Sequence, residues 1–387
     1  MENFKYQNPT KIVFGKGQIQ SLDQEIPTDA KRILLLYGGG SIKKNGVYNE
    51  VIKHLQAAGK EVVELAGVEP NPRLTTVQKG IDLVKEHELD FILAVGGGSV
   101  IDCAKAIAIG SRYDGDVWDI ILKKAVPTSA VPFGTVLTIA ATGSEMNSGG
   151  VITNWEENDK RSFGSIYTYP KFSILDPELT YSVPLNQTIY GIVDTMSHVF
   201  EQYFNASTNT PLQDRFGESI LRTVLEVGPK LVKDLHSYEY REVMMLNSTF
   251  ALNGVLSMGV KTDWATHMIE HAVSAVYDIP HGGGLAILFP SWMSFVSEQK
   301  PEKVAQLGKN VFDLDATGKT DAELAKETIA ALQEFWTSIG APTKLADFDI
   351  DDAQLDLMAE RSMVAEKIGS YVPLSKEDVK EILKRSL

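Results

Sequence analysis

The segment Phe91-Ile-Leu-Ala-Val95-Gly-Gly-Gly-Ser99-Val100 decides the fold of the N-terminal half. Five apolar residues are typical of a buried strand, and the helical pattern over 100–109 makes the glycines a tight strand-to-helix turn. The same order of strand and helix occurs at 32–37 with 47–55, and at 61–65 with 76–86. This alternation predicts a parallel sheet with helices on both faces.

The second half of the chain has a different pattern. Further strands are expected at 131–139, 150–153 and 172–176, and a short N-terminal hairpin or edge strand at 4–14. Nine helical stretches are expected at 188–204, 211–234, 239–258, 262–277, 283–298, 301–313, 320–339, 351–366 and 375–386. We therefore predict an α/β domain at 1–184 and an all-helical domain at 185–387.

Composition restricts the class of protein. The 387 residues, 43% of them hydrophobic, are enough for one large or two ordinary domains. The net charge of −14 argues against nucleic acid as a partner. The single cysteine, Cys103, cannot form an intrachain disulfide, and neither a secretory signal nor a membrane-spanning run is present. These features predict a protein of the reducing cytoplasm.

Four of the seven histidines lie in three short motifs, at 194–198, 267–271 and 280–284. Asp194 and His198 are spaced i, i+4, as are His267 and His271, so each pair shares one helix face. His281 follows Pro280, which ends the preceding helix and lets the chain turn back. Carboxylate and imidazole donors without a thiolate suit Fe(II) or Zn(II). The alternative for the first pair is a solvated polar face.

The turn at 96–99 is a candidate anion site. Three glycines let the backbone approach a ligand, and the free N–H groups of the next helical turn, with Ser99 as the cap, attract a pyrophosphate. Asp102, one turn into the helix, is placed to cap it or to bond a ligand. A plain tight turn is the alternative, since the G-x-G-x-x-G pattern is absent.

Together these motifs and the stretch 138–145 resemble the iron-containing, or group III, alcohol dehydrogenase family. Within it the chain is most similar to bacterial butanol dehydrogenases and NADPH-dependent broad-range aldehyde reductases. The resemblance covers essentially the whole chain. It implies that 1–184 is a dinucleotide-binding domain, that 185–387 is a metal-binding and substrate domain, and that cofactor and metal meet in a cleft. It implies metal ligands at Asp194, His198, His267 and His281, pyrophosphate contacts at Gly97, Gly98 and Ser99, and nicotinamide-side contacts at Thr138, Thr142 and Lys160.

Cofactor choice is predicted from the turn Gly38-Gly39-Gly40-Ser41 after the first strand. NAD-preferring relatives have an aspartate where Gly39 stands, and its absence removes repulsion of a 2′-phosphate. Lys43 or Lys44 adds positive charge nearby. We therefore expect NADP(H), and we also expect Asn71, in the loop after the second strand, to contact it. The alternative is that the glycines only form the turn.

The resemblance implies hydride transfer between NADP(H) and a primary alcohol or aldehyde such as butanol and butanal, assisted by one divalent metal. His271, one turn from His267, is expected to relay the proton, although it is equally consistent with a packed histidine. Two alternatives remain open: a metal-dependent cyclase or lyase similar to dehydroquinate synthases, and a non-catalytic metal- or nucleotide-binding protein. The N-terminal edge strand predicts a homodimer.

Overall fold

The computed structural model describes residues 1–387 as two compact units. The sheet unit comprises Gln7–Val183 and Leu235–Thr249, and the helical unit comprises Met1–Tyr6, Pro184–Asp234 and Phe250–Leu387. Two segments therefore differ from the predicted division at 184/185. Met1–Tyr6 joins the helical unit because Glu2 N–H donates to the Gly259 carbonyl (2.9 Å). Leu235–Thr249 joins the sheet unit, where the Thr249 hydroxyl donates to Glu145 (2.5 Å).

A six-stranded parallel sheet forms the centre of the sheet unit. Its strands are β1 (Lys11–Phe14), β2 (Arg32–Tyr37), β3 (Glu61–Leu65), β4 (Phe91–Gly96), β5 (Phe133–Leu137) and β8 (Phe172–Leu175). Their order is β1-β8-β5-β4-β2-β3. The prediction of a parallel sheet is confirmed, and the N-terminal strand lies at an edge, paired with β8 alone.

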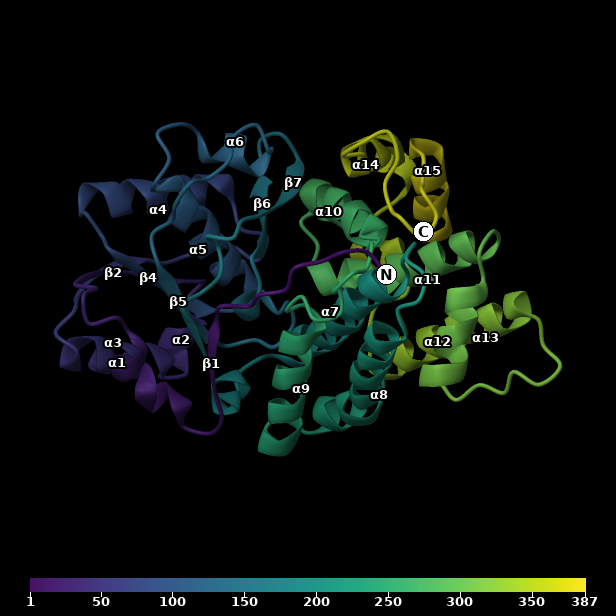
Figure 1. Ribbon diagram of the computed structural model, residues 1–387, viewed down its shortest axis with the longest axis horizontal. Coiled ribbons are helices and arrows are strands. Elements are labelled where there is room, and N and C mark those ends of the chain that lie inside the picture. The colour runs from purple at the N-terminus through teal and green to yellow at the C-terminus, as the bar shows by residue number, and fades with distance from the viewer. The chain divides into compact units, whose positions relative to one another are not determined.

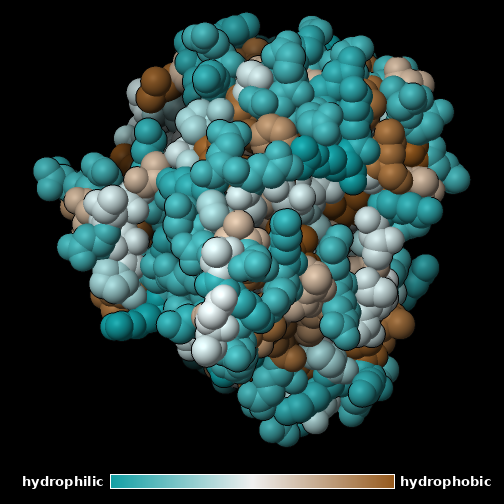
Figure 2. Space-filling view, turned by 90° about the vertical axis from the view of Figure 1, so that its right-hand side faces the viewer, coloured by the Kyte–Doolittle hydropathy of each residue, from teal (hydrophilic) through white to brown (hydrophobic).

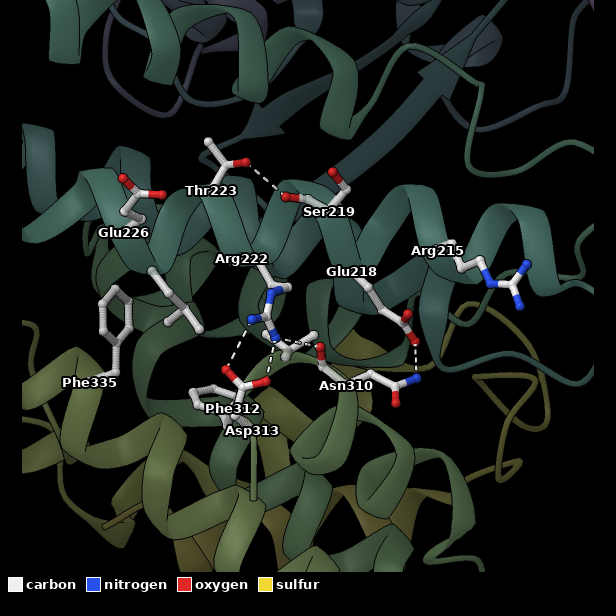
Figure 3. A pocket seen from close by; sticks show the side chains of 12 residues that line it. Arg215, Glu218, Ser219, Arg222, Thr223, Glu226, Asn310, Phe312, Asp313 and Phe335 are labelled. Atoms are coloured by element: carbon white, nitrogen blue, oxygen red, sulfur yellow. Dashed lines mark hydrogen bonds and ion pairs between the residues drawn. The ribbon is translucent and has the colours of Figure 1, made fainter. Parts of the chain in front are cut away.

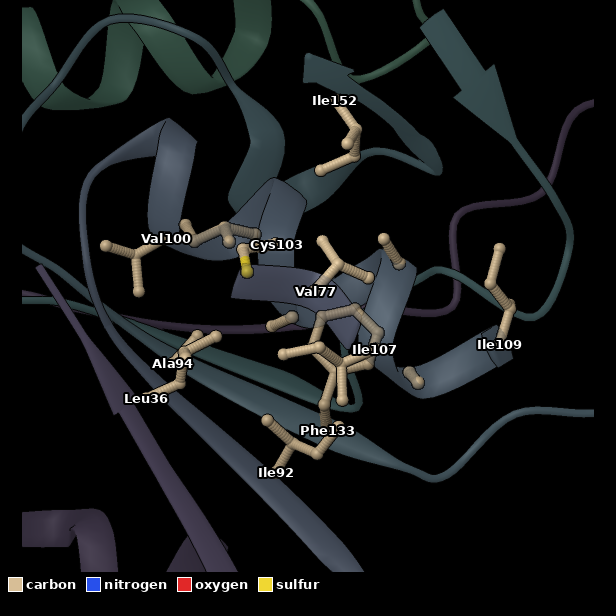
Figure 4. Close-up of a cluster of buried hydrophobic side chains, with 14 of the residues drawn as sticks. Leu36, Val77, Ile92, Ala94, Val100, Cys103, Ile107, Ile109, Phe133 and Ile152 are labelled. Atoms are coloured by element: carbon tan, nitrogen blue, oxygen red, sulfur yellow. The ribbon is translucent and has the colours of Figure 1, made fainter. Parts of the chain in front are cut away.

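Side chains alternate along the central strands and form two cores. Leu34 and Leu36 of β2 point into the cluster that α4 (Leu74–Glu86), α5 (Gly98–Gly110) and α6 (Val117–Ile121) cover. Figure 4 shows Leu36 in this cluster. Ile33 and Leu35 point into the opposite cluster, under α1 (Leu22–Glu25), α2 (Ser41–Lys44) and α3 (Val47–Ala57). The two helical layers are visible above and below the strands in Figure 1. Burial on both faces explains why these strands are continuous apolar runs.

A separate antiparallel pair extends the sheet unit. β6 (Gly149–Asn154) pairs with β7 (Asp159–Gly164). β6 was predicted, but β7 was not, because its sequence Asp-Lys-Arg-Ser-Phe-Gly lacks an apolar run. β7 is instead stabilised as a strand by its antiparallel pairing with β6.

The helical unit is built from long amphipathic helices. They are α7 (Leu185–Tyr203), α8 (Pro211–Lys233), α10 (Ala265–Tyr277), α11 (His281–Ser297), α12 (Glu302–Val311), α13 (Asp321–Ser338), α14 (Leu355–Ser362) and α15 (Lys376–Arg385). α9 (Tyr238–Ala251) contributes mainly to the sheet unit. All nine predicted helical stretches are confirmed, although α9 and α14 are shorter than predicted. α7 packs against α8 and α11, and α10 packs against α11 and α14.

Helix starts follow local sequence rules. Ser375 and Asp378 form a reciprocal capping box at the start of α15, as the acidic first turn predicts, and Thr320 and Glu323 do the same for α13. None of the helices combines the length and the apolar character needed to cross a bilayer. On the face drawn in Figure 2, hydrophilic residues predominate and hydrophobic ones form small separate groups.

Candidate metal centre and nucleotide site

Asp194 and His198 lie on α7 inside the helical unit. Their i, i+4 spacing places the Nε2 atom of His198 3.5 Å from the Oδ1 atom of Asp194. The two residues are only 3% and 5% exposed. The alternative of a solvated polar face is therefore wrong, because these polar side chains point into the protein.

Two other helices bring histidines to the same place. His267 is on α10, which ends at Tyr277, and Asp278 follows with a φ of 53°. Pro280 breaks the chain direction as predicted and caps α11, whose first residue is His281, two residues before the predicted start at 283. The His267 ring lies 5.0 Å from the ring of His198 and 5.2 Å from that of His281, between centroids.

The four predicted ligands therefore converge. The Nε2 atom of His281 is 3.7 Å from Oδ1 of Asp194. One ligand atom each from Asp194, His267 and His281 lies within 4.8 Å of the others. Sequence positions 87 residues apart are thus brought to one point by α7, α10 and α11.

The donors fit a divalent cation. Oδ1 of Asp194 and Nε2 of His267 are buried, and neither atom has a hydrogen-bond partner. Burying polar atoms without partners is costly, so a native protein needs something to satisfy them. One carboxylate and three imidazoles form a borderline donor set that suits Fe(II) or Zn(II).

Two buried glutamates orient the imidazoles. Oε1 of Glu201 lies 2.7 Å from Nδ1 of His267 and also accepts the His267 backbone N–H at 2.9 Å. Its other oxygen accepts the Trp264 N–H at 2.6 Å. Glu270 likewise contacts Nδ1 of His281 and the Ser274 hydroxyl. With the proton on Nδ1, each ring presents the lone pair of Nε2 to an ion.

Sequence reasoning missed both glutamates, although a signal was present. Glu201 follows Asp194 and His198 at helical spacing, seven residues after the first. Glu270 stands three residues after His267 and immediately before His271. A search for carboxylates at i+3 and i+7 from the candidate ligands would have found them.

His271 lies beside the centre rather than among its buried donors. Its ring centroid is 6.2 Å from that of His267 and 5.5 Å from that of His281. It is partly exposed, and one of its nitrogens groups with Glu270 and His281 within 4.8 Å. Its role as a proton relay stays a prediction.

Asp263 anchors the start of α10. Its carboxylate accepts the backbone N–H groups of Ala265 (3.0 Å), Ser370 (2.8 Å) and Tyr371 (2.7 Å). Burial, with the nearby charge of Glu201, raises the pKa of Asp263 to about 7. The turn before His267 is thereby tied to the loop at 370–371.

The candidate nucleotide site lies at the carboxyl edge of the parallel sheet. The chain runs from β2 outward to β3 and then back to β4, so the strand order reverses between β2 and β4. Ligands of open α/β sheets bind at such a switch point. Gly38, Gly39, Gly40 and Ser41 follow β2, and Gly97, Gly98 and Ser99 follow β4. Thr138 follows the next strand, β5, and its N–H donates to the Gly96 carbonyl (3.0 Å).

Packing explains the glycine at the start of α5. A Cβ atom on Gly98 would lie 2.4 Å from a side-chain carbon of Thr142. The N-cap of α5 is Gly97, not Ser99 as predicted, and the Ser99 hydroxyl donates instead to the Pro70 carbonyl. This correction leaves the amides of the first turn of α5 as the group that would face a pyrophosphate.

Asn71 and Lys160 lie side by side. The Lys160 ammonium donates to Oδ1 of Asn71 at 3.0 Å, which joins β7 to the loop before α4. The Thr153 N–H donates to the Pro72 carbonyl at 2.8 Å in the same region. The structure thus brings together two predicted cofactor contacts from positions far apart in the sequence.

Asp102 has structural partners. Oδ1 accepts the Ser144 hydroxyl at 2.5 Å, and Oδ2 accepts the Val151 N–H at 2.9 Å. Burial raises the pKa of Asp102 and lowers that of the neighbouring Lys105 to about 8. Lys105 donates to Ser144 (2.7 Å) and to the Gly149 carbonyl (2.5 Å). This buried pair holds the segment after Thr142, and a contact of Asp102 with the cofactor stays a prediction.

A hollow of about 820 Å³ lies elsewhere in the helical unit, between α8 and the segment around Asp313 (Figure 3). Arg222 crosses it to the Asp313 carboxylate, with nitrogen–oxygen distances of 2.8 and 3.0 Å. None of the predicted site residues lines it. The candidate site is therefore identified by its donor atoms, and its residues do not line this hollow.

A parallel sheet with a glycine-lined switch point, together with a buried carboxylate–imidazole centre, defines a metal-dependent, nucleotide-binding class of enzyme. Family models identify it further: the iron-containing alcohol dehydrogenase model matches residues 9–177, and the C-terminal model of the Fe-containing alcohol dehydrogenase family matches 188–387. The chain belongs to the iron-containing alcohol dehydrogenase family. It is thus an oxidoreductase of the alcohol dehydrogenase type, and the family implies a nicotinamide cofactor and an iron-type metal.

Individual relatives agree with this assignment. The chain is 60% identical to probable NADH-dependent butanol dehydrogenase 1 of Bacillus subtilis (strain 168), over 100% of both chains. It is 40% identical to the NADPH-dependent aldehyde reductase YqhD of Escherichia coli (strain K12), over 93% of each. The crystal structure of NADH-dependent butanol dehydrogenase A from Thermotoga maritima matches with a TM-score of 0.96 and 40% identity, covering 100% of this chain and 99% of that one.

Proposed function

We propose that this protein transfers hydride between NADP(H) and a primary alcohol or aldehyde such as butanol and butanal, with one Fe(II) or Zn(II) ion. The observation that carries the proposal is the pair of buried donor atoms without hydrogen-bond partners, Asp194 Oδ1 and His267 Nε2, beside His198 and His281. Membership of the family favours this reaction over the cyclase and the non-catalytic alternatives.

In this proposal the side chains of the centre have three roles: binding the ion, orienting the imidazoles and transferring the proton. Asp194, His198, His267 and His281 would hold the ion, with Glu201 and Glu270 fixing the imidazoles. When bound, the ion supplies Lewis-acid polarisation of the carbonyl oxygen and NADPH supplies the hydride. His271, partly exposed and next to this group, would pass the proton to solvent.

Aromatic rings beside the donors support an apolar substrate. The Trp264 ring is 5.0 Å from the ring of His267, and the Phe289 ring is 6.4 Å from it. Linear or short branched aldehydes and their alcohols suit such surroundings better than phosphorylated or carboxylated compounds. A hundredfold or greater preference for an anionic substrate would contradict this part of the proposal.

The preference for NADP(H) over NAD(H) is the finer part of the proposal. Relatives named for either cofactor do not decide it. Support comes from Gly39, which carries no acidic side chain, and from Ser41 and Lys43 shortly after it. A carboxylate at this position would repel a 2′-phosphate and accept a bond from the ribose hydroxyl. We expect kcat/KM to favour NADPH by at least about tenfold, or roughly 1.4 kcal/mol.

Gly39→Asp tests the cofactor preference. A Cβ atom at Gly39 meets nothing within 4 Å, so a side chain can start there without a clash at its first carbon. We expect the variant to lose much of the NADPH preference in kcat/KM, because it adds both charge repulsion and a ribose acceptor. Gly39→Asn, which adds nearly the same volume without charge, is the matched control. Equal use of both cofactors by the unmodified protein, or no response to Gly39→Asp, would contradict the proposal.

Elemental analysis of freshly purified protein, with activity measured after replacement of the metal, tests the metal. Fe(II) and Zn(II) both suit the donor set, so occupancy depends on availability as well as affinity. A protein fully active without any divalent ion would contradict the mechanism.

We also propose a cytoplasmic location, which is compatible with a buried cysteine that forms no disulfide, Cys103.

A further inference from the structure

A cluster of polar side chains lies next to the turn that is proposed to bind the 2′-phosphate. Glu64, near the end of β3, accepts hydrogen bonds from the hydroxyls of Tyr37 (2.6 Å) and Tyr48 (2.5 Å). Tyr37 is the last residue of β2 and directly precedes Gly38. All these residues belong to the sheet unit.

Lys43 completes the cluster. Its ammonium lies 3.5 Å from the Glu64 carboxylate, and 5.1 and 4.5 Å from the ring centroids of Tyr37 and Tyr48. It stands two residues after Ser41, on the short helix that follows the glycines. The positive charge that would attract a phosphate is therefore already engaged by one carboxylate and two aromatic faces.

Both members of the ion pair are charged near neutral pH. Burial acts to raise the pKa of Glu64, but the bonds from Tyr37 and Tyr48 together with the charge and bond of Lys43 outweigh it, and the pKa is lowered. The bond with Tyr37 raises the pKa of Lys43. The Lys43 side chain is 49% exposed and that of Glu64 is 36% exposed, so a ligand in solvent can reach the pair and compete for Lys43.

We propose that Glu64 is a specificity-determining residue that holds Lys43 and so limits the preference for a 2′-phosphorylated cofactor. This inference rests on the proposed nicotinamide-nucleotide site at Gly38–Ser41. A 2′-phosphate must draw Lys43 away from Glu64 and also meets the carboxylate charge, whereas a 2′-hydroxyl does neither. Removal of the carboxylate charge therefore strengthens NADPH binding and leaves NADH binding nearly unchanged.

Glu64→Gln tests the inference, because glutamine keeps an oxygen that accepts a hydrogen bond from tyrosine. Dissociation constants of NADPH and NADH are measured by nucleotide fluorescence on the metal-loaded protein. We expect the NADPH constant to fall about threefold or more, and the NADH constant to change less than about twofold. At high salt the difference shrinks, since the residues are partly exposed.

Glu61→Gln is the matched control, with the same change of charge on the same strand. Glu61 lies three residues earlier, about 10 Å along β3 at 3.3 Å per residue, at the opposite end. We expect its NADPH-to-NADH ratio to equal that of the unmodified protein. Glu64→Thr, a residue that favours strands, provides a second removal of the charge if the glutamine variant folds poorly.

A double-mutant cycle separates an effect through Lys43 from a structural effect. In a Lys43→Gln background, Glu64→Gln should improve NADPH binding clearly less than in the unmodified protein, because only the direct repulsion of the phosphate is then removed. An unchanged cofactor ratio in both Glu64 variants, or the same gain without Lys43, overturns the inference. The cofactor preference itself is judged on the unmodified protein, so its failure is distinguishable from failure of the Glu64 effect, which is a ratio between variant and parent.

Discussion

Single atoms define the candidate metal centre. Nδ1 of His267 faces Glu201, and its Nε2 has no hydrogen-bond partner. One nitrogen of the His267 ring therefore contacts the protein, and the other is available to an ion. His271 differs, because it is partly exposed and lies to one side of the buried donors.

Alanine substitutions should separate ligands from the proposed proton relay. We expect His267→Ala and His281→Ala to lose the ion and abolish turnover, while NADPH still binds because its predicted contacts are all in the sheet unit. His271→Ala should keep the ion, lower kcat and change the pH profile. Metal content, kcat and NADPH affinity are the measurements, and His87→Ala, an exposed histidine, is the control. A protein that loses its ion in His271→Ala but retains it in His281→Ala would refute the ligand assignment.

In the proposed centre, Glu201 would act on the metal through His267. Glu201→Gln weakens the acceptor for the Nδ1 proton and introduces an amide that can turn the wrong way. We expect metal affinity, measured by competition with a chelator, to fall roughly 10- to 100-fold, as for other residues that orient ligands. Glu226→Gln, an exposed glutamate on α8, should have no effect. Equal affinities for the Glu201 variant and the parent would show that the contact is only structural.

At the level of elements, the start of α11 sets the position of His281. Gly282 follows it, and a Cβ atom there would lie 2.3 Å from the backbone oxygen of Tyr190 on α7. A Cβ atom on Gly284 would lie 2.9 Å from Glu270. The glycines after His281 therefore allow α11 to approach α7 and α10, which carry the other donors.

Gly282→Ala tests this close packing. Because the obstacle is backbone, α11 must shift, and we expect a loss of about 1–3 kcal/mol in the free energy of unfolding together with weaker metal binding. Gly228→Ala on α8 is the control, since its new Cβ would have only ordinary contacts at 3.5 Å. That variant should change the free energy of unfolding by less than about 1 kcal/mol, because the helix propensity of alanine offsets the cost of a Cβ before Pro229. Chemical denaturation gives both values; a neutral Gly282→Ala would contradict the packing argument.

The elements that were predicted correctly are those with a strong local sequence signal. β2 and β4 are uninterrupted apolar runs, and Pro280 marks the break between α10 and α11. β7 was missed because its residues are mostly polar, so only pairing with β6 makes it a strand. α9 was predicted to reach residue 258 but ends at Ala251. Gly254, whose φ is 94°, lies in the stretch that was wrongly predicted to be helical.

The same contrast between local sequence signals and tertiary contacts holds for the candidate site. Spacing at i, i+4 predicted which histidines share a helix face, and the family resemblance supplied the ligand assignment. Nothing local states that Glu201 meets His267, which is 66 residues away. Ser99 was predicted to cap α5, whereas the fold turns its hydroxyl toward Pro70. Such partners are chosen by the packing of whole elements, and therefore need the tertiary structure.

At the scale of the whole molecule, the proposed reaction uses both units. Predicted nucleotide contacts are in the sheet unit, and the candidate ligands are in the helical unit. Each unit contains residues from distant parts of the sequence, including Met1–Tyr6 in the helical unit. A truncation at 184/185 would therefore divide both units, and it is a poor choice for isolating either.

The open edge of the sheet leads to a prediction about assembly. β1 pairs with β8 on one side only, where Lys11 N–H donates to Lys171 (3.2 Å) and Gly15 N–H to Leu175 (3.0 Å). Alternation along the strand then turns the N–H of Ile12 to the open side. Exposed edges of this kind pair with other strands, and a second copy across a two-fold axis is the simplest partner.

Ile12→Pro should therefore weaken a homodimer without breaking the bonds of β1 to β8, because proline removes an outward-facing N–H and is tolerated at sheet edges. We expect the parent to sediment at twice the mass of one chain at micromolar concentration, and the variant to shift toward the monomer. Ile12→Val keeps the N–H and should behave as the parent. Thermal unfolding of all three proteins checks that the sheet unit remains folded. A parent that sediments only as a monomer would rule out the dimer, and a variant that stays dimeric would place the interface away from β1.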